Sequence, residues 1–457
     1  MSLGGTALQI ITLEESGSDA TSGGGSASAP SLCGIRLERD NLRSIVDKIP
    51  KETKVAIVSV VGGFRTGKSF LLTLLLRYLK VQGGRPAEGQ DWLHEDGETL
   101  SEGNCNAKSA GAKNGDSSSV SPTGGFQWRG GHERMTTGIW MWSEPFLRVD
   151  SETGERLAVL LMDTQGMFDN ETTMTLTAQI FGMSTLISSL QIYNIQNRIS
   201  EDHLQHLALF SEYGRIAHQR GDTTTNGETT EAVPSTAPKP FQRLQFLVRD
   251  WANFKEQWPE SGEGAALRER ESQAYSNLRE EMQAYLDRLI RTRGDISLQS
   301  TRDQISRCFE RVDCFMLPHP GIPITKPNYD GSIKVLDSSF CGLVDQFARL
   351  VFDEQLEPKR VHKRFITGIE LANYFEAYVK LFQSGEGFPK AMTILEATAE
   401  ANNRSAYDLA LSKYIEIMGP ISGTGANEAF MRETDLKVSE CVNPLHSPCS
   451  LCGTVQF

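Results

Sequence analysis

An apolar run that leads directly into a glycine-rich loop and then into a helix constrains this chain most. Residues Val55–Val61 are continuously apolar and mostly β-branched, which is typical of a strand buried on both faces of a parallel sheet. Residues Ser69–Leu79 carry leucines at helical spacing. A strand, a tight glycine turn and a helix in this order predict an α/β domain.

The loop between these elements has the spacing Gly-x-x-x-x-Gly-Lys-Ser, which is typical of a phosphate-binding loop. Its backbone N–H groups can face a β-phosphate, Lys68 can reach the β and γ oxygens, and Ser69 can present a hydroxyl to Mg²⁺. The following helix N-terminus favours an anion. The candidate nucleotide-binding residues of this P-loop are Gly62, Gly63, Phe64, Arg65, Thr66, Gly67, Lys68, Ser69 and Phe70.

A second buried run, Arg156–Met162, ends in the turn Asp163-Thr164-Gln165-Gly166. A carboxylate at the carboxyl end of a strand beside the P-loop suits the ligand shell of Mg²⁺, usually through water. Gly166 can bring its backbone N–H near a γ-phosphate, and Gln165 belongs to the same candidate set. The Asp-x-x-Gly pattern therefore supports a Mg²⁺-dependent nucleoside triphosphate site.

The segment Leu247-Val248-Arg249-Asp250 places an acidic residue at the end of a further strand. A carboxylate there can accept hydrogen bonds from N1–H and N2–H₂ of guanine, whereas adenine presents an acceptor at N1. Asp250 would then select GTP over ATP. From these residues alone, an ordinary surface ion pair is the more common explanation of an Arg-Asp dipeptide.

The order of the remaining elements indicates the domain organisation. Strands alternate with helices over about 250 residues, which predicts a mostly parallel sheet flanked by helices. The expected elements are an amphipathic helix at Arg36–Ile49, helices at Leu176–Leu190, Asp202–His218 and Arg268–Leu289, strands at Leu244–Val248 and Val312–Leu317, and later helices at Leu371–Phe382 and Lys390–Met418.

We expect four parts along the chain. Residues 1–35 form a disordered tail, within which Ala7–Leu13 alternates well enough to be a short strand. Residues 36–350 form the α/β domain, with low-complexity surface insertions at about 96–125 and 221–240. Residues 351–440 form a helical module that looks truncated, and residues 441–457 form an irregular tail.

Composition excludes several classes of protein. The formal net charge of −12 argues against nucleic-acid binding, because phosphate contacts need concentrated Lys and Arg. The chain has no apolar stretch of about 18 to 20 residues and no signal-peptide pattern, so we expect no membrane span in the chain as written. Among eight cysteines, Cys449 and Cys452 lack the second pair of a zinc site, which favours reduced intracellular thiols.

Several motifs together resemble one family. They are Arg129-Gly130-Gly131, Thr136-Thr137-Gly138-Ile139, Asp163-Thr164-Gln165-Gly166 and Phe246-Leu247-Val248-Arg249-Asp250-Trp251. This set is similar to the dynamin-superfamily large GTPases that include guanylate-binding proteins and atlastins. The segments His203-Leu204-Gln205-His206 and Glu396-Ala397-Thr398-Ala399-Glu400-Ala401-Asn402-Asn403 resemble atlastins more closely. The resemblance runs from about Lys54 to Met418 and implies a P-loop GTPase domain followed by a partial helical bundle.

The resemblance also implies roles for individual residues. Arg249 and Asp250 would form the guanine motif, Thr136 would be the switch threonine that completes the Mg²⁺ shell, and Arg129 would lie in the same loop. Pro318-His319-Pro320 would cap the guanine ring. The implied ligands are GTP or GDP with Mg²⁺. The expected catalytic residues are Arg65, Lys68 and Thr136, and the expected metal ligands are Ser69, Thr136 and Asp163.

The position after the Asp-x-x-Gly turn bears on hydrolysis. Ras-like enzymes carry a glutamine there that orients the attacking water, whereas this chain has Met167. Arg65 is the candidate replacement, because a fixed guanidinium can neutralise charge on the β–γ bridge, and the family carries an arginine at this loop position. Alternatively, Arg65 binds phosphate only in the ground state or pairs across a dimer.

Family resemblance further implies nucleotide-dependent homodimers that tether and fuse endoplasmic reticulum membranes from the cytosolic face. This chain resembles only the beginning of the family's helical bundle and lacks a counterpart of its transmembrane hairpin. Two alternatives therefore stay open. One is a GTP-regulated binding protein that pairs with full-length family members and turns over slowly; the other is a defence GTPase similar to guanylate-binding proteins.

Overall fold

The computed structural model describes residues 5–15, 32–81, 85–87, 90–95, 125–128, 136–149, 154–167, 173–208, 239–259, 264–290, 296–326, 329, 331–361, 364–383 and 391–418. Within these ranges, nine strands form one mixed sheet in the order β2-β1-β4-β6-β3-β7-β8-β9, with β5 also beside β6. The strands are β1 (Ala7–Glu15), β2 (Leu32–Leu37), β3 (Lys54–Gly62), β4 (Ile139–Trp142), β5 (Phe146–Val149), β6 (Arg156–Thr164), β7 (Leu190–Gln196), β8 (Phe241–Arg249) and β9 (Phe309–Met316).

The centre of the sheet is parallel. Strand β3 pairs in parallel with β6 and β7, β7 pairs with β8, and β8 pairs with β9. Successive side chains of β3 alternate between two hydrophobic cores, with Val55 and Ile57 in one and Val58 and Val60 in the other. A strand buried on both faces explains the continuous apolar run, and the predicted α/β class is confirmed.

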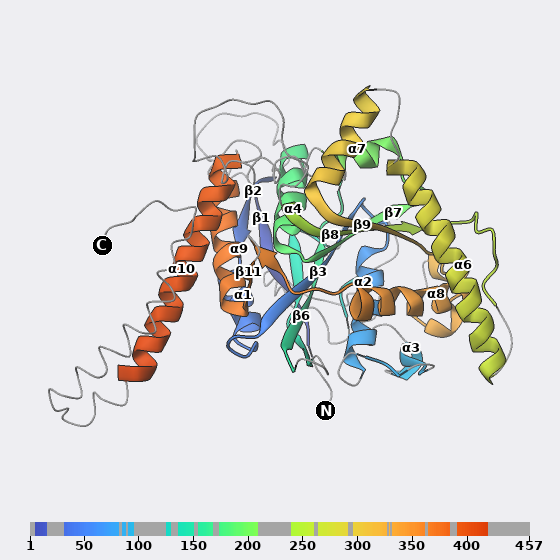
Figure 1. The fold of residues 1–457 in the computed structure, drawn as a ribbon, viewed down its shortest axis with the longest axis horizontal. Coiled ribbons are helices and arrows are strands. Elements are labelled where there is room, and N and C mark those ends of the chain that lie inside the picture. The colour runs from blue at the N-terminus through green and yellow to red at the C-terminus, as the bar shows by residue number, and fades with distance from the viewer. Residues whose placement is uncertain are drawn as a thin grey trace, which may run out of the picture.

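Helices cover both faces of this sheet (Figure 1). Side chains of α1, α4 and α9 join one core, whereas those of α2, α6 and α8 join the other. The helices are α1 (Arg39–Val46), α2 (Lys68–Lys80), α3 (Trp92–Glu95), α4 (Met174–Ile187), α6 (Gly264–Ile290), α7 (Ile296–Cys308), α8 (Ser338–Arg349), α9 (Gly368–Gln383) and α10 (Ala391–Met418). Shorter elements are 3-10 turns at Ile322–Thr325 and Ile333–Val335, a π-helical turn at Leu350–Glu354, and the hairpin β10 (Arg360–Val361) and β11 (Arg364–Phe365).

The expected disordered tail needs correction. Strands β1 and β2 form the antiparallel edge of the sheet, and β1 pairs with β4 on its other side. Burial of Ile10 and Ile11 stabilises β1 in this position, although its surroundings in the sequence are rich in glycine and serine. The alternative of a short strand at Ala7–Leu13 was therefore the right one. The expected helix at Arg36 begins only at Arg39, because β2 extends to Leu37.

Several elements escaped the sequence patterns. Strands β4, β5 and β7 and helices α7 and α8 were not predicted. The helix expected to reach Leu190 ends at Ile187, and β7 begins at Leu190. The helix expected at Asp202–His218 is present over residues 201–208, and its remainder lies outside the described residues. Most of the two insertions, the final segment and Cys449 and Cys452 also lie outside them.

Helix α9 belongs to the core of the nucleotide domain. Its residues Leu371, Tyr374 and Phe375 are buried with Ile45 and Ile57 against the sheet. The expected boundary at residue 350 therefore does not coincide with a change of hydrophobic core. Within the described part of the chain, no helix combines the length and hydrophobicity needed to cross a membrane.

The connection to α9 is held by a buried lysine at the opposite end of β3 from the P-loop. The backbone N–H of Lys359 donates to the carbonyl of Val55 at 2.7 Å, and its Nζ donates to the carbonyl of Ser188 at 2.8 Å. Burial lowers the pKa of the Lys359 ammonium to about 7. Both bonds fix the entry to α9 against the sheet.

Candidate functional site

The P-loop leaves β3 through a glycine that no larger residue can replace without strain. Gly62 has φ 154°, and a Cβ there would lie 2.2 Å from the carbonyl oxygen of Asn194 on β7. The side-chain amide of Asn194 donates to the carbonyl and hydroxyl oxygens of Thr66 at 2.7 and 2.9 Å. Thr66 in turn donates to the carbonyl of Gly63 at 2.9 Å. Strand β7 therefore fixes the shape of the loop.

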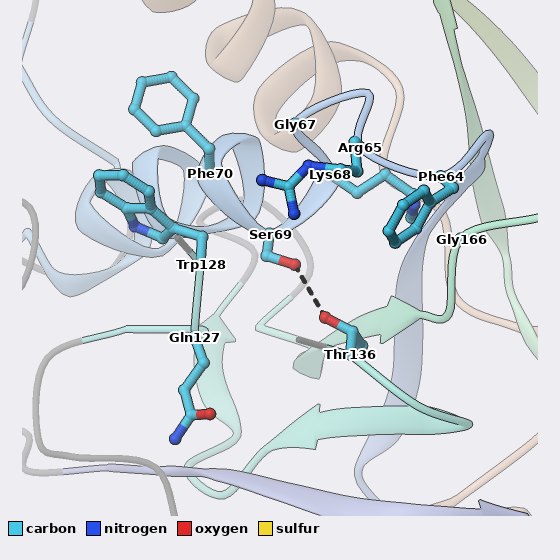
Figure 2. A pocket seen from close by; sticks show the side chains of 10 residues that line it. All are labelled: Phe64, Arg65, Gly67, Lys68, Ser69, Phe70, Gln127, Trp128, Thr136 and Gly166. Carbon is cyan, nitrogen blue, oxygen red and sulfur yellow. Dashed lines mark hydrogen bonds between the residues drawn. The ribbon is translucent and has the colours of Figure 1, made fainter. Parts of the chain in front are cut away.

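The loop closes around the ammonium group of Lys68. Gly67 adopts φ 77° as the N-cap of α2, and the buried Lys68 reaches back so that Nζ donates to the carbonyl of Gly63 at 3.0 Å. This places a cation beneath the turn and the N-terminus of α2 behind it, an arrangement suited to phosphate. An open pocket of about 140 Å³ lies over this turn (Figure 2), lined by Phe64, Arg65, Gly67, Lys68, Ser69, Phe70, Gln127, Trp128, Thr136 and Gly166.

The three expected metal ligands converge beside this pocket. The Ser69 hydroxyl donates to Oδ2 of Asp163 at 2.5 Å. The Thr136 hydroxyl lies 3.3 Å from that of Ser69, as Figure 2 shows, and 3.4 Å from the same carboxylate oxygen. The P-loop and the segment before β4 thus each contribute a hydroxyl, the end of β6 contributes a carboxylate, and the three groups meet at one point.

Asp163 is buried and only partly satisfied. Burial raises its pKa to about 6, although the nearby Lys68 ammonium opposes this shift. Its Oδ1 is buried and has no hydrogen-bond partner among the described residues. A buried carboxylate oxygen without a partner, next to two hydroxyls, fits a hard divalent cation such as Mg²⁺. Within the described ranges, no group of three or more His, Cys, Asp or Glu side chains is arranged to hold a metal ion.

The turn after Asp163 lies directly on the P-loop. A Cβ on Gly166 would come within 2.5 Å of Cα of Phe64, so only glycine permits this approach. The backbone N–H of Phe64 donates to the carbonyl of Met167 at 2.9 Å, and that of Met167 donates to Gly62 at 3.0 Å. The two phosphate-facing segments are therefore joined by their backbones.

Gln165 faces away from the pocket. Its side-chain oxygen accepts a hydrogen bond from the backbone N–H of Gly138 at 2.9 Å. The backbone N–H of Gln165 donates to the Gly138 carbonyl at 2.8 Å. The side chain is buried and does not line the pocket. Gln165 thus joins the Asp163 turn to the segment of Thr136.

Arg249 lies beneath the P-loop and also does not line the pocket. Its Nη1 is 3.5 Å from the position of a Cβ on Gly67, and its guanidinium carbon is 5.7 Å from the ring of Phe340. Its Nε and Nη1 are buried without partners among the described residues. Burial lowers the pKa of this guanidinium to about 10. The structure thus places the Arg249 guanidinium beside Gly67 of the P-loop.

Asp250 follows at the carboxyl end of β8 in a left-handed conformation, with φ 58°. Its carboxylate accepts a hydrogen bond from Nε2 of Gln196 at 2.9 Å. Backbone bonds from Leu317 to Val248 at 2.8 Å and from Trp251 to Leu317 at 3.0 Å bring the segment before Pro318 alongside. The two segments expected to hold guanine are therefore neighbours, although Asp250 does not line the phosphate pocket.

Backbone strain gathers at this edge of the sheet. Within the described ranges, four residues other than glycine have positive φ, and Arg65, Asn197 and Asp250 among them follow β3, β7 and β8. Such conformations persist where the surroundings enforce them, which is common at functional sites. The sequence reasoning missed Asn194, because β7 itself was not recognised. Arg129 lies outside the described residues.

An aromatic wall borders the pocket on one side. Trp128 meets Phe70 edge to face at 5.4 Å between ring centroids and lies 5.7 Å from Tyr329. Neither Gln127 nor Trp128 was singled out from the sequence, since they follow a low-complexity segment without periodicity. Figure 2 shows Trp128 and Phe70 together at the end of the pocket away from Phe64.

A glycine loop around a buried lysine and a hydroxyl–carboxylate cluster where β3 and β6 end define a P-loop nucleotide site. Residues 34–360 match the family described as guanylate-binding protein, N-terminal domain. The chain belongs to this family, and the membership indicates a GTPase.

Proteins similar to this chain include atlastins of several animals. The chain is 38% identical to atlastin-1 of Bos taurus over 397 residues, which cover 86% of the chain and 60% of the relative. It is 36% identical to atlastin-2 of Homo sapiens over 389 residues, covering 85% and 56%. It is 34% identical to atlastin of Drosophila melanogaster over 431 residues, covering 92% and 65%. The chain thus spans about 60% of the length of the atlastin-1 relatives it matches.

Proposed function

We propose that this chain binds GTP with Mg²⁺, hydrolyses it to GDP and phosphate, and pairs with a second copy in its GTP-bound state. The observation that carries the proposal is the meeting of Ser69, Thr136 and Asp163 beside the P-loop. These three side chains would hold Mg²⁺, which when bound neutralises phosphate charge. By likeness to atlastins, the activity would serve tethering and fusion of endoplasmic reticulum membranes.

The chain's own residues have distinct tasks in this proposal. The P-loop N–H groups and Lys68 bind the phosphates, and Gly166 presents its backbone to the γ-phosphate. Asp250 would accept hydrogen bonds from the guanine edge, with the segment around His319 covering the ring. Arg249 would complete the guanine motif with Asp250, and its guanidinium lies beside Gly67 of the P-loop.

The proposal is tested by light scattering combined with phosphate release. We expect a monomer with GDP, a dimer with a non-hydrolysable GTP analogue, and steady release of phosphate from GTP but not from ATP. A protein that binds neither GDP nor the GTP analogue in the presence of Mg²⁺ would refute the proposal. Dimers that form equally with GDP would refute the link between pairing and the γ-phosphate.

Replacing Arg65 should separate binding from hydrolysis. Arg65 lines the pocket within the P-loop, where its guanidinium can stabilise charge that develops during phosphoryl transfer. We expect Arg65→Ala to lower kcat about a hundredfold while KM changes by less than about threefold. Arg156→Ala, at the start of β6 and exposed, is the matched control. An unchanged kcat with a raised KM would show that Arg65 only binds the ground state.

A second candidate function rests on a specific observation. Met167 follows the Asp-x-x-Gly turn, and the one glutamine of that turn, Gln165, holds Gly138 instead of facing the pocket. With no water-orienting amide there, the chain would act as a GTP-regulated binding protein that pairs with itself or with longer family members and turns over slowly. Dimers on the GTP analogue together with negligible phosphate release would favour this candidate.

A further inference from the structure

The two residues that follow the switch threonine are held from both sides. Thr136 is followed by Thr137 and Gly138, and β4 begins at Ile139. On one side, Gln165 bonds both backbone groups of Gly138. On the other side lies the N-terminal strand β1, which belongs to the part of the chain that precedes the family match at residue 34.

Strand β1 contacts this segment through a side chain. Nε2 of Gln9 donates to the carbonyl oxygen of Thr137 at 3.0 Å and lies 3.3 Å from its hydroxyl. The same carbonyl accepts from Nε1 of Trp140 at 2.8 Å. Two donors from different strands therefore occupy both lone pairs of one carbonyl, which fixes its direction.

The backbone of β1 is shaped to receive Gly138. The pairing of β1 with β4 shifts register between Gln9 and Ile11, as at a β-bulge. Gly138 has φ 69°, and a Cβ there would lie only 1.9 Å from the carbonyl oxygen of Ile11. The side-chain amide of Asn41 on α1 donates to the carbonyl of Gln9 at 2.8 Å and so fixes this part of β1.

We propose that Gln9 is a positioning residue for the switch threonine. The amides of Gln9 and Gln165 hold Thr137 and Gly138 between them, so that the hydroxyl of Thr136 lies ready beside Ser69 and Asp163. The N-terminal strand would thereby help to distinguish GTP from GDP, because in the proposed function Thr136 engages the triphosphate with its cation and not the diphosphate. This inference rests on the proposed function.

The test uses the full chain with Gln9→Glu and Gln9→Leu. Glutamate keeps the length of the side chain but presents an acceptor to the Thr137 carbonyl, and leucine keeps most of the volume without a donor. Thr12→Val is the matched control, since Thr12 lies on the same strand and its hydroxyl bonds Glu38 at 2.9 Å, away from the switch segment. Thr136→Ala serves as the reference for loss of the switch hydroxyl.

Two measurements are expected to change in both Gln9 variants. Affinity for a non-hydrolysable GTP analogue with Mg²⁺ should fall about tenfold, as for the loss of a well-formed hydrogen bond, whereas affinity for GDP should stay unchanged. In the nucleotide-free protein, amide hydrogen exchange of residues 136–142 should quicken, while exchange of β3 and α2 stays unchanged. Thr12→Val should leave both quantities at their original values.

The outcomes separate this inference from the proposed function. If the Gln9 variants lost affinity equally for the analogue and for GDP, Gln9 would only support the fold, and the positioning role would be wrong. Unchanged hydrogen exchange of residues 136–142 would also overturn the positioning role. If Thr136→Ala itself fails to lower analogue affinity relative to GDP, the proposed role of Thr136 is wrong. If Thr136→Ala has this effect and the Gln9 variants do not, the positioning role alone is wrong.

Discussion

Replacing Lys68 with methionine should lower GTP affinity about a thousandfold, or ~4 kcal/mol, as expected when one partner of a desolvated charge pair is removed. Methionine keeps the length and most of the volume of the side chain, so the P-loop loses its central cation and little packing. Lys68 is buried, and its Nζ lies 3.0 Å from the carbonyl of Gly63 inside the turn. Titration of fluorescent GTP into the purified variant measures the effect.

The matched control for this variant is Lys359→Met. Lys359 is also a buried lysine that donates to a backbone carbonyl, that of Ser188 at 2.8 Å, but it lies at the other end of β3. We expect the control to alter thermal stability and to leave GTP affinity unchanged. If Lys68→Met bound GTP within threefold of the original chain, the P-loop would not be the phosphate site.

The second large effect concerns the choice of base. Asp250→Asn should lower GTP affinity about a hundredfold, because an amide offers one acceptor where guanine presents two donors. Xanthosine triphosphate should bind the variant better than the original chain, since xanthine carries a carbonyl at C2 that the new amide can donate to. Competition binding with GTP, xanthosine triphosphate and ATP measures both changes.

The backbone makes this substitution a fair test. Asp250 has φ 58°, and asparagine is among the few residues other than glycine that adopt this conformation readily. Asp287→Asn is the matched control, because Asp287 also accepts from a glutamine Nε2, that of Gln283 at 2.8 Å, on the exposed face of α6. Unaltered preference for guanine in Asp250→Asn would contradict the assigned role of Asp250.

Long apolar runs predicted the two central strands β3 and β6, which are buried on both faces. Strands β3 and β6 are mostly apolar, as expected for strands that contact a hydrophobic core on each face of the sheet. Strand β7 is equally buried but carries Gln191 and Asn194, whose hydrogen bonds go to Thr185 and to the P-loop. Thr185 lies on α4 before the turn into β7, and the P-loop is distant in the sequence, so no periodicity revealed the strand.

The sequence indicated which residues to expect at the candidate site, but it did not indicate the directions of their side chains. Spacing indicated the P-loop and, beside it, Asp163, because motif spacing follows the course of the backbone. The role of Asp250 was expected from the family resemblance and stays a prediction. The direction of a side chain depends on neighbours that only the fold supplies. Spacing did not indicate that the Gln165 side chain bonds Gly138 or that the Arg249 guanidinium lies beside Gly67, and the expected nucleotide contacts of both residues stay predictions.

The packing of α9 makes this helix part of the core of the nucleotide domain. Leu371, Tyr374 and Phe375 are inserted in the sheet's hydrophobic core, so swinging α9 outward would expose three large side chains to water. Helix α10 is joined to α9 partly by polar contacts, including Asn373 to Ser405 at 3.1 Å, and its later turns are exposed. Shortening the chain before α9 is therefore expected to destabilise the nucleotide domain itself and not only the helices that follow it.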